Sequence, residues 1–557
     1  MPSVAERMPD GREGVDETLP NSTAVLRDAG WERIQLHLRF DAHSAVDVER
    51  LALVGTWPDE PPVTMRPTNI HRDADLVVAR FNVMLGPGQH PLRGGPWTLS
   101  EIGPDGQATP IALRLAAPLD RDRLDRDFKY PGGRYQVTPA IDEAGILTLT
   151  IRNRRAGRRR SPTRRWSIRH WKRRFQRRAW FRRRVFLTLY RLHRAMAPRD
   201  GRRILFTSDS HSELTGNLAV IHDRMLARGL DRDYRLETIF RPSIAMRRSW
   251  RDRWRLPRLL ARADVILLDD YQPIIYRLPP DPTQRIIQLW HASGALKTVG
   301  YSRVGKPGGP TPYARRHKNY TYALVSGMHD VPYYAEAFGL PEERVVPTGI
   351  PRMDRYFDEA HSERSRARAR ELFPQIEGRM TILFAPTFRG HGPRGAHYDY
   401  DLIDWAALHA LCVEKDAVVI WKMHPFVRTQ APIPKAYRDR IIDASRSPMD
   451  VNDLIFSVDL LVTDYSSIVF EFSTQMKPMI FFAYDLDEYI ASRDFYVPFD
   501  EFVPGPIVRT FEELIGLIRT ERYDAEEVAA FARRHFDHLD GSATDRVIDE
   551  LILARPD

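Results

Sequence analysis

The chain has 557 residues, too many for one hydrophobic core, so several domains are expected. No apolar run is long enough to cross a membrane, and the polar first residues lack the apolar core of a signal peptide, which predicts a protein that stays in the cytosol. The single cysteine, Cys412, excludes internal disulfides and cysteine zinc clusters. It lies in the apolar stretch ALHALCV, where we expect a buried core thiol.

The formal charge of +10 is concentrated in one segment. Residues 152–194 hold 19 Lys and Arg and no Asp or Glu, so the rest of the chain carries the difference, −9. The composition therefore indicates one basic segment within an otherwise acidic protein.

Two regions precede the basic segment. Residues 1–29 are polar and aperiodic, which predicts a disordered leader. Residues 30–151 alternate apolar and polar positions, as in IQLHLRF and ILTLTIRN, with Gly, Pro and Asp between the runs. This pattern predicts a small antiparallel β-sandwich as an accessory domain. No residue pattern in it points to a ligand.

The basic segment, assigned to residues 152–200, has the periodicity of an imperfect amphipathic helix. The apolar side chains on one helical face are Ile168, Trp171, Phe175, Ala179, Phe186 and Leu189. Aromatic residues opposite arginines suit a helix on an anionic membrane surface. The same composition suits RNA, and a solvated interdomain linker is a third interpretation.

From residue 201 onward, short Val/Ile/Leu runs alternate with helical segments. RILFTSD, ADVILLDD, RIIQLW, YALVS, TILFAPT, AVVIWKM, LLVTDYSS and PMIFF are typical of parallel strands covered on both faces. The count predicts two doubly wound α/β halves, residues 201–350 (the first half) and 351–557 (the second half). Ligands of such folds bind at the carboxyl ends of the strands.

Polar clusters follow three predicted strands of the second half. They are Pro386-Thr387-Phe388-Arg389, Lys422-Met423-His424-Pro425 and Thr463-Asp464-Tyr465-Ser466-Ser467. Ser466 and Ser467 occupy a strand-to-helix turn, which favours a phosphate, although a plain helix cap explains one serine equally well. Glu471 follows by one helical turn and is positioned to accept hydrogen bonds from ribose hydroxyls.

Three cations, Arg389, Lys422 and His424, are expected to converge beside these serines on a pyrophosphate. No P-loop, magnesium-binding DxD loop or HExxH motif is present, so neither a bound metal nor a resident cofactor is predicted.

Residues 202–553 resemble the CDP-glycerol glycerophosphotransferase family, which comprises the teichoic acid polymerases and primases. Eight motifs in order carry this resemblance: ILFTSDSHSELTGN, QLWHASGALKTVG, TGIPRMD, ILFAPTFRG, WKMHP, VNDLIFSVDLLVTDYSSIVFEF, PMIFFAYDLDEY and RDFYVPFDEFVPGPIV. The resemblance implies a two-domain GT-B fold. One departure is that many members have Trp-His-Gly-Thr where this chain has Trp-His-Ala-Ser at 290–293.

The resemblance also implies roles for individual residues. His291 matches the histidine proposed as general base for the acceptor hydroxyl, and His424 matches the one that contacts the donor phosphates and steadies the departing CMP. Ser466 and Ser467 match phosphate-binding serines. Arg352 and Arg389 match basic positions around the active site.

These roles predict transfer of glycerol phosphate, or a related polyol phosphate, from CDP-glycerol to a lipid-linked polymer, with release of CMP. We expect the enzyme at the cytoplasmic face of the membrane, held peripherally through residues 152–194, with no nucleic acid partner. Two alternatives stay open on the residues alone: a GT-B glycosyltransferase with a nucleotide-sugar donor, and an RNA- or membrane-binding protein whose GT-B half is inactive.

Overall fold

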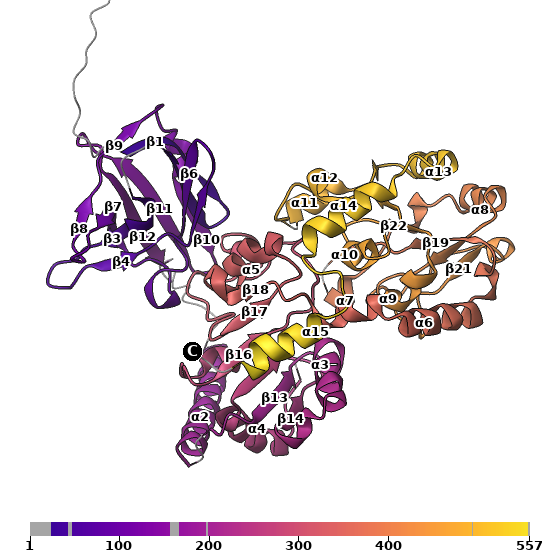
Figure 1. Ribbon diagram of the computed structural model, residues 1–557, viewed down its shortest axis with the longest axis horizontal. Coiled ribbons are helices and arrows are strands. Elements are labelled where there is room, and N and C mark those ends of the chain that lie inside the picture. The colour runs from indigo at the N-terminus through magenta and orange to yellow at the C-terminus, as the bar shows by residue number, and fades with distance from the viewer. Residues whose placement is uncertain are drawn as a thin grey trace, which may run out of the picture. The chain divides into compact units, whose positions relative to one another are not determined.

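The computed structural model describes residues 24–42, 47–155, 166–196, 199–244, 246–390, 392–492 and 494–554. It contains two compact units, Met1–Gly157 and Arg158–Asp557 (Figure 1). Residues 1–23 of the predicted leader lie outside the described part. Residues 24–29, which were also assigned to the leader, already form strand, because this stretch, AVLRDA, pairs with two neighbouring strands.

Two sheets make up the described part of the first unit. One has the order β5 (Asn69–Arg72), β6 (Leu76–Asn82), β2 (Gln35–Asp41), β1 (Ala24–Glu32) and β9 (Leu113–Leu115). The other has the order β10 (Arg126–Tyr130), β11 (Gly133–Ile141), β12 (Leu147–Arg155), β7 (Gly95–Ile102), β3 (Leu51–Gly55) and β4 (Val63–Met65), with β8 (Ala108–Pro110) beside β7.

Most of these strands pair antiparallel, but β1 and β9 pair in parallel. Trp31 of β1 and Phe128 of β10 meet edge to face at 6.0 Å, which joins the two sheets through an aromatic contact. A fully buried tyrosine, Tyr135, donates its hydroxyl proton to the carbonyl of Leu92 at 2.9 Å. The buried polar end of this side chain is thereby satisfied.

The second unit contains two six-stranded parallel sheets. The first parallel sheet has the order β14 (Arg235–Phe240), β13 (Arg203–Ser208), β15 (Val265–Leu268), β16 (Arg285–Gln288), β17 (Tyr322–Leu324) and β18 (Val345–Val346). The second parallel sheet has the order β21 (Ile441–Asp443), β20 (Ala417–Trp421), β19 (Met380–Phe384), β22 (Leu460–Thr463), β23 (Met479–Phe482) and β24 (Ile507–Val508). The prediction of an α/β fold is confirmed.

Helices cover both parallel sheets (Figure 1). The main ones are α2 (Trp166–Met196), α3 (Gly216–Ala227), α4 (Trp250–Arg262), α5 (Val331–Phe338), α6 (Glu359–Leu372), α8 (Trp405–Glu414), α10 (Ile468–Ser473), α11 (Leu486–Ser492), α13 (Phe511–Thr520), α14 (Ala525–His535) and α15 (Ala543–Arg546). Cys412 is buried on α8, where burial raises the pKa of its thiol to about 12. This agrees with the predicted core thiol.

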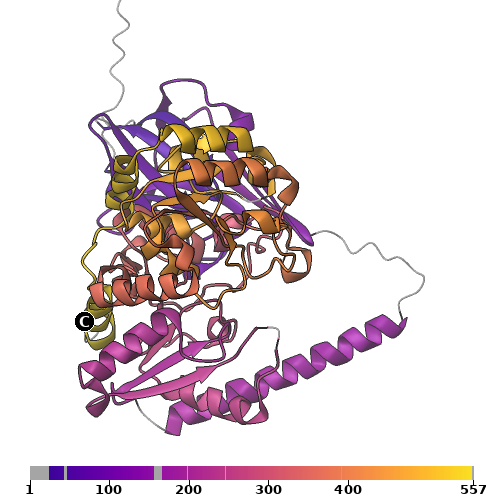
Figure 2. The same cartoon turned by 90° about the vertical axis from the view of Figure 1, so that its right-hand side faces the viewer.

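The basic segment contains α2, which Figure 2 shows as one long helix. α2 packs beside α4. Residues 156–165, the backbone at 197–198 and the side chains of 166–179 lie outside the described part, so four members of the predicted apolar face are not placed. None of the helices in the described part of the chain combines the length and the apolar character needed to span a bilayer.

The end of the chain returns to the first half. Arg224 of α3 donates two hydrogen bonds to Asp545 of α15, at 2.8 and 2.6 Å, and Arg228 pairs with Asp549 at 2.7 Å. Arg285, at the start of β16, donates to the carbonyls of Leu551 and Ile552 at 3.0 and 2.9 Å. These contacts tie the carboxyl-terminal residues of the second half to the first half.

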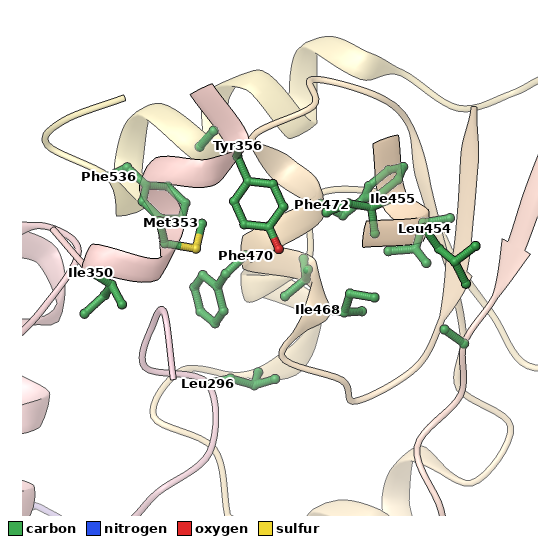
Figure 3. Packing of buried hydrophobic residues seen from close by; sticks show 14 of the residues in the cluster. Leu296, Ile350, Met353, Tyr356, Leu454, Ile455, Ile468, Phe470, Phe472 and Phe536 are labelled. Atoms are coloured by element: carbon green, nitrogen blue, oxygen red, sulfur yellow. The ribbon is translucent and has the colours of Figure 1, made fainter. Parts of the chain in front are cut away.

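The two halves also share a hydrophobic core around Phe470 of α10. Leu296 and Ile350 from the first half lie in the same buried cluster as Phe470 and Phe536 from the second (Figure 3). Because the cluster is continuous, the loops at the strand ends of both sheets have a common support.

Candidate active site

Thr387 and Asp464 meet at the point where the strand order of the second sheet reverses, between β19 and β22. This is where open α/β sheets bind ligands. The backbone N–H and the hydroxyl of Thr387 both donate to Oδ1 of Asp464, at 2.8 and 2.5 Å. Asp464 is buried, so this pair serves to join two strand-end loops.

Arg389 is enclosed by acids and aromatic rings. Its guanidinium pairs with Asp464 at 2.9 Å and with Asp485 at 2.5 Å, and it lies over the rings of Tyr465, Tyr484 and Tyr489. Burial by itself would lower the pKa of Arg389, but Asp464 and the hydrogen bond that Arg389 donates to Asp485 raise it. Arg389 is predicted to contact a donor pyrophosphate; in the structure the buried carboxylate of Asp464 and the half-buried carboxylate of Asp485 already neutralise its charge.

Lys422 is likewise occupied. Its ammonium donates to the backbone carbonyls of Ala444 and Met449 at 2.8 Å each, and to that of Ser447 at 3.3 Å. Burial lowers its pKa. Lys422 therefore fastens the end of β20 to the loop after β21, and the convergence of Arg389, Lys422 and His424 on a pyrophosphate stays a prediction.

His424, unlike Arg389 and Lys422, is exposed. Its ring packs against Phe388 at 4.8 Å and Phe426 at 4.6 Å between centroids. This local burial, with a smaller effect of Lys297, lowers its pKa. The N–H of Phe426 donates to Nδ1 at 3.1 Å, which assigns the neutral ring a proton on Nε2. His424 thus offers one outward donor without a positive charge.

Ser466 and Ser467 lie directly before α10. Ser467 is exposed, and its hydroxyl has no hydrogen-bond partner within the described ranges, whereas the hydroxyl of Ser466 accepts the N–H of Ile468 at 3.3 Å. Of the polar groups in this strand-end cluster, Ser467 is the one most open to a ligand.

His291 is turned outward by an unusual backbone conformation at Trp290. Trp290 is buried and has φ of +55°, a strained conformation for a bulky residue. Two side chains hold it. Oε1 of Gln288 accepts the N–H of Trp290 at 2.9 Å, and Nδ2 of Asn217 donates to its carbonyl at 2.6 Å. The indole is thereby buried while the imidazole of His291, 57% exposed, faces away from the core.

Asp270 is a neighbour of His291 that the sequence analysis missed. It follows β15, and its Oδ1 lies 3.7 Å from Nδ1 of His291. Ser210, after β13, donates to the other carboxylate oxygen at 2.5 Å. The loops after β13 and β15 flank the strand-order reversal of the first sheet, so the switch-point rule identifies Asp270 once that order is known.

A second acid and histidine adjoin this group. Asp269 is buried, which raises its pKa, and it lies 3.6 Å from Nε2 of His211. The motif TSDSH (207–211) and the pair Asp269-Asp270 are therefore brought together by the fold, although 58 residues or more separate them in sequence.

Arg352 and Glu471 of the second half form an ion pair that contacts the His291 loop of the first half. Arg352 also donates to Ser293 Oγ at 3.0 Å and to the carbonyl of His291 at 3.2 Å, and Ser293 donates to Glu471 at 2.8 Å. Glu471 is buried. Glu471 is predicted to accept hydrogen bonds from a ribose. In the structure, its carboxylate binds Arg352 and Ser293 and thereby fixes the loop that carries His291.

The small residues after His291 are explained by packing between the halves. A Cβ added to Gly294 would overlap the ring of Phe470. The loop continues into a short antiparallel pairing, with Thr298 N–H donating to the Asp494 carbonyl at 2.9 Å and Tyr496 N–H to the Leu296 carbonyl at 3.1 Å. The structure thus places the second half beside these small residues.

The structure thus divides the predicted site residues into two groups. His291, His424 and Ser467 are exposed, and Ser466 is half-buried. The other predicted residues hold the strand-end loops together: Arg352, Thr387, Arg389, Lys422, Asp464 and Glu471. Charge and position in the sequence predict which residues gather here, but the internal partners decide which ones are open to a ligand.

Residues 188–553 match the family of CDP-Glycerol:Poly(glycerophosphate) glycerophosphotransferases. The teichoic acid ribitol-phosphate polymerase TarK of Staphylococcus aureus is 46% identical over 367 residues, which cover 66% of this chain and 71% of that one. The teichoic acid glycerol-phosphate primase of Bacillus subtilis is 27% identical over 295 residues, 52% of this chain and 74% of that one.

A solved structure of the wall teichoic acid polymerase TagF superposes with a TM-score of 0.51 at 22% identity, covering 69% of this chain and 95% of that chain. This likeness supports the α/β fold of the second unit. With the family match spanning most of the chain and the strand-end motifs in place, the chain belongs to the CDP-glycerol:poly(glycerophosphate) glycerophosphotransferase family, as its motifs predicted.

Proposed function

We propose that this protein transfers ribitol phosphate from CDP-ribitol to a hydroxyl of a lipid-linked teichoic-acid-like polymer, releasing CMP. The observation that carries the choice of polyol is the 46% identity to a ribitol-phosphate polymerase, against 27% to a glycerol-phosphate primase. The donor named in the sequence analysis, CDP-glycerol, becomes the alternative substrate of the same reaction. We also propose that the second unit has a GT-B fold, in which the first half binds the acceptor and the second half binds the donor.

In the proposed reaction, His291 accepts the proton of the acceptor hydroxyl while the oxygen attacks the phosphorus that bears ribitol. A new phosphorus–oxygen bond forms, the bond to the bridging oxygen breaks, and CMP leaves with the electron pair. The exposed imidazole and its neighbour Asp270 support this role. The carboxylate orients the ring and stabilises the cation that forms on it.

The donor phosphates are assigned to the second sheet. Ser467, with Ser466 beside it, offers hydroxyls at the end of β22, and His424 offers Nε2–H at the end of β20. A neutral donor at His424 stabilises charge that develops on the departing CMP without binding the intact donor as tightly as a fixed cation would. No step is assigned to a resident cofactor.

We further propose a peripheral location on the cytoplasmic face of the membrane, through α2 and α4. A hollow of about 740 Å³ lies between them and the loop before α4. Exposed aromatic side chains that line it are Phe181, Trp250 and Trp254, and arginines accompany them on both helices. Aromatic residues beside arginines suit an interface of acyl chains and anionic headgroups.

The proposed function is tested with purified protein, a lipid-linked acceptor that ends in a polyol phosphate, and either CDP-ribitol or CDP-glycerol. CMP release and polymer growth are measured, with His291→Ala as the inactive control. We expect CDP-ribitol to be used at least about tenfold more efficiently, as kcat/KM. Equal use of both donors contradicts the assignment of ribitol, and release of UDP from UDP-sugars without CMP release from either donor contradicts the reaction.

A further inference from the structure

Two histidines and an aspartate gather at the junction between the first half and α14. His329 and Asp330 lie in the short helical turn Met328–Asp330 before α5, and His535 is the last residue of α14. One ligand atom from each side chain lies within 4.8 Å of the other two. No local sequence motif predicts this group, because more than 200 residues separate Asp330 from His535.

The buried members of this group lack hydrogen-bond partners. Asp330 is fully buried, and neither of its carboxylate oxygens has a partner among the described residues, nor does Nδ1 of His535. That nitrogen lies 3.6 Å from Oδ1 of Asp330, too far for a direct hydrogen bond. A buried carboxylate without any donor is costly, so native proteins seldom leave one in this state.

Apolar side chains, in place of hydrogen-bond donors, pack against this group. The His535 ring lies against Phe531 at 4.3 Å, Phe470 at 5.3 Å and Phe502 at 5.6 Å. His329 meets the same ring edge to face at 4.7 Å and is only half-buried, so it gives the group a side toward solvent. Burial lowers the pKa of His329, with smaller lowering effects of His535 and Arg534 and an opposing effect of Asp330.

We propose that His329, Asp330 and His535 bind one divalent transition-metal ion, for which Zn²⁺ is the probe. Imidazole and carboxylate are zinc ligands at bond lengths of about 2.0–2.2 Å. In a tetrahedral site with such bonds, neighbouring ligand atoms lie about 3.4 Å apart. The 3.6 Å between His535 and Asp330 fits this spacing. The fourth position is open to water on the half-buried side of His329.

The proposed ion has a structural role because it joins elements that already meet closely. Asp537 accepts the N–H of Met328 at 3.0 Å, and a Cβ on Gly327 would approach the carbonyl of His535 to 2.8 Å. Ser326, in the same loop, donates to the carbonyl of Ser293. The metal therefore holds α14 against the loop that supports the segment after His291, and its binding energy adds to the stability of the folded chain.

The test uses the full chain, freed of any affinity tag and stripped of metal by a chelator that is then removed. Zinc content by mass spectrometry, a calorimetric titration with Zn²⁺, the visible spectrum of the Co²⁺ form and Tm are measured. Variants His329→Ala and Asp330→Asn remove ligands, and His538→Ala removes a nearby exposed histidine as the matched control. His329→Ala, at a half-buried position, remains informative if Asp330→Asn does not fold.

We expect one equivalent of Zn²⁺ to bind and raise Tm, and Co²⁺ to give the absorption bands of a four-coordinate site. Affinity is expected to fall at least about tenfold in the ligand variants and to stay unchanged in His538→Ala. The proposal is overturned if stripped protein takes up no stoichiometric Zn²⁺, or if the folded ligand variants bind it as tightly as the parent chain.

Discussion

His291 and Asp270 come from the ends of adjacent parallel strands, with Nδ1 of the imidazole 3.7 Å from Oδ1 of the carboxylate. Ser210 donates to the other oxygen of Asp270 at 2.5 Å, which holds the carboxylate in place beside the exposed ring of His291. This arrangement matches that of a general base with an orienting acid.

Replacing either residue is therefore expected to lower turnover. His291→Ala removes the base, for which a loss of at least about a hundredfold in kcat is expected, and Asp270→Asn keeps the shape but removes the charge, for which a smaller loss is expected. Steady-state CMP release measures both. His409→Ala, at a half-buried histidine stacked on Tyr437, is the control. Turnover near the parent value in His291→Ala would return His291 to a purely structural role.

Gly294→Ala is expected to destabilise the protein, because the added methyl group overlaps the buried ring of Phe470. Overpacking of this kind costs roughly 1–3 kcal/mol in the free energy of unfolding. The matched control is Gly516→Ala in α13, where an added Cβ meets nothing within 4 Å. That change is expected to raise stability slightly, since alanine is the better helix former. Thermal unfolding compares the two, and equal Tm values would contradict tight packing of the halves at Gly294.

Arg389→Gln is expected to lower the stability of the protein, whereas Ser467→Ala is expected to lower its affinity for the donor. The first leaves Asp464 and Asp485 without their cation, at a cost of about 3–5 kcal/mol in unfolding free energy. The second removes an exposed hydroxyl, so Tm stays nearly constant while donor affinity falls roughly tenfold or more. Denaturation and calorimetry with the CDP-polyol measure the two effects. Unchanged donor affinity in a folded Ser467→Ala variant would place the phosphates elsewhere.

His317 is expected to make stability depend on pH. It is fully enclosed, and burial, with Arg316, lowers its pKa from 6.5 to about 3. The folded chain keeps this ring neutral, whereas the unfolded chain binds a proton below about pH 6.5. The contribution of His317 is thus fully present above pH 6.5 and is lost as pH falls toward 3, by up to about 1.4 kcal/mol per pH unit.

Urea denaturation at about pH 7.5 and about pH 5, on either side of the unfolded-state pKa, measures this effect, with His317→Phe as the comparison. The variant is expected to lose less stability between the two pH values than the parent chain. An equal loss in both proteins would mean that other groups cause the dependence.

The α2–α4 surface is expected to bind anionic vesicles. Changing Arg182, Arg183 and Arg184 to Gln should release the protein at moderate salt, because each basic residue near such a surface contributes on the order of 1 kcal/mol. The control changes Arg364, Arg368 and Arg370 of α6, which are also exposed, so that the net charge falls equally. Vesicle sedimentation measures binding. Equal release by both triple variants would indicate that only net charge matters, and tighter binding to RNA than to vesicles would overturn the membrane assignment.

Much of the architecture follows from the sequence by itself. Continuous apolar runs identify the inner strands β13, β15, β16, β19, β20, β22 and β23, because a strand covered on both faces has no polar side. The strands that went unpredicted, β14, β18, β21 and β24, are the edges of the two parallel sheets. Edge strands are short or half-exposed, as RLETIF of β14 shows, and so lack a continuous apolar pattern.

The sequence also determines which residues gather at the strand ends, since ligand-binding loops follow parallel strands. Only the tertiary structure decides which of these residues already have partners within the protein. Arg389, Lys422 and Glu471 have the chemistry of ligand-binding groups, yet carboxylates, carbonyls and Arg352 hold them inside the protein. Asp270 beside His291, and His535 beside Asp330, depend on strand order and on the path of α14. Local pattern carries no information about such pairs, because the contacts form only when segments far apart in the chain pack together.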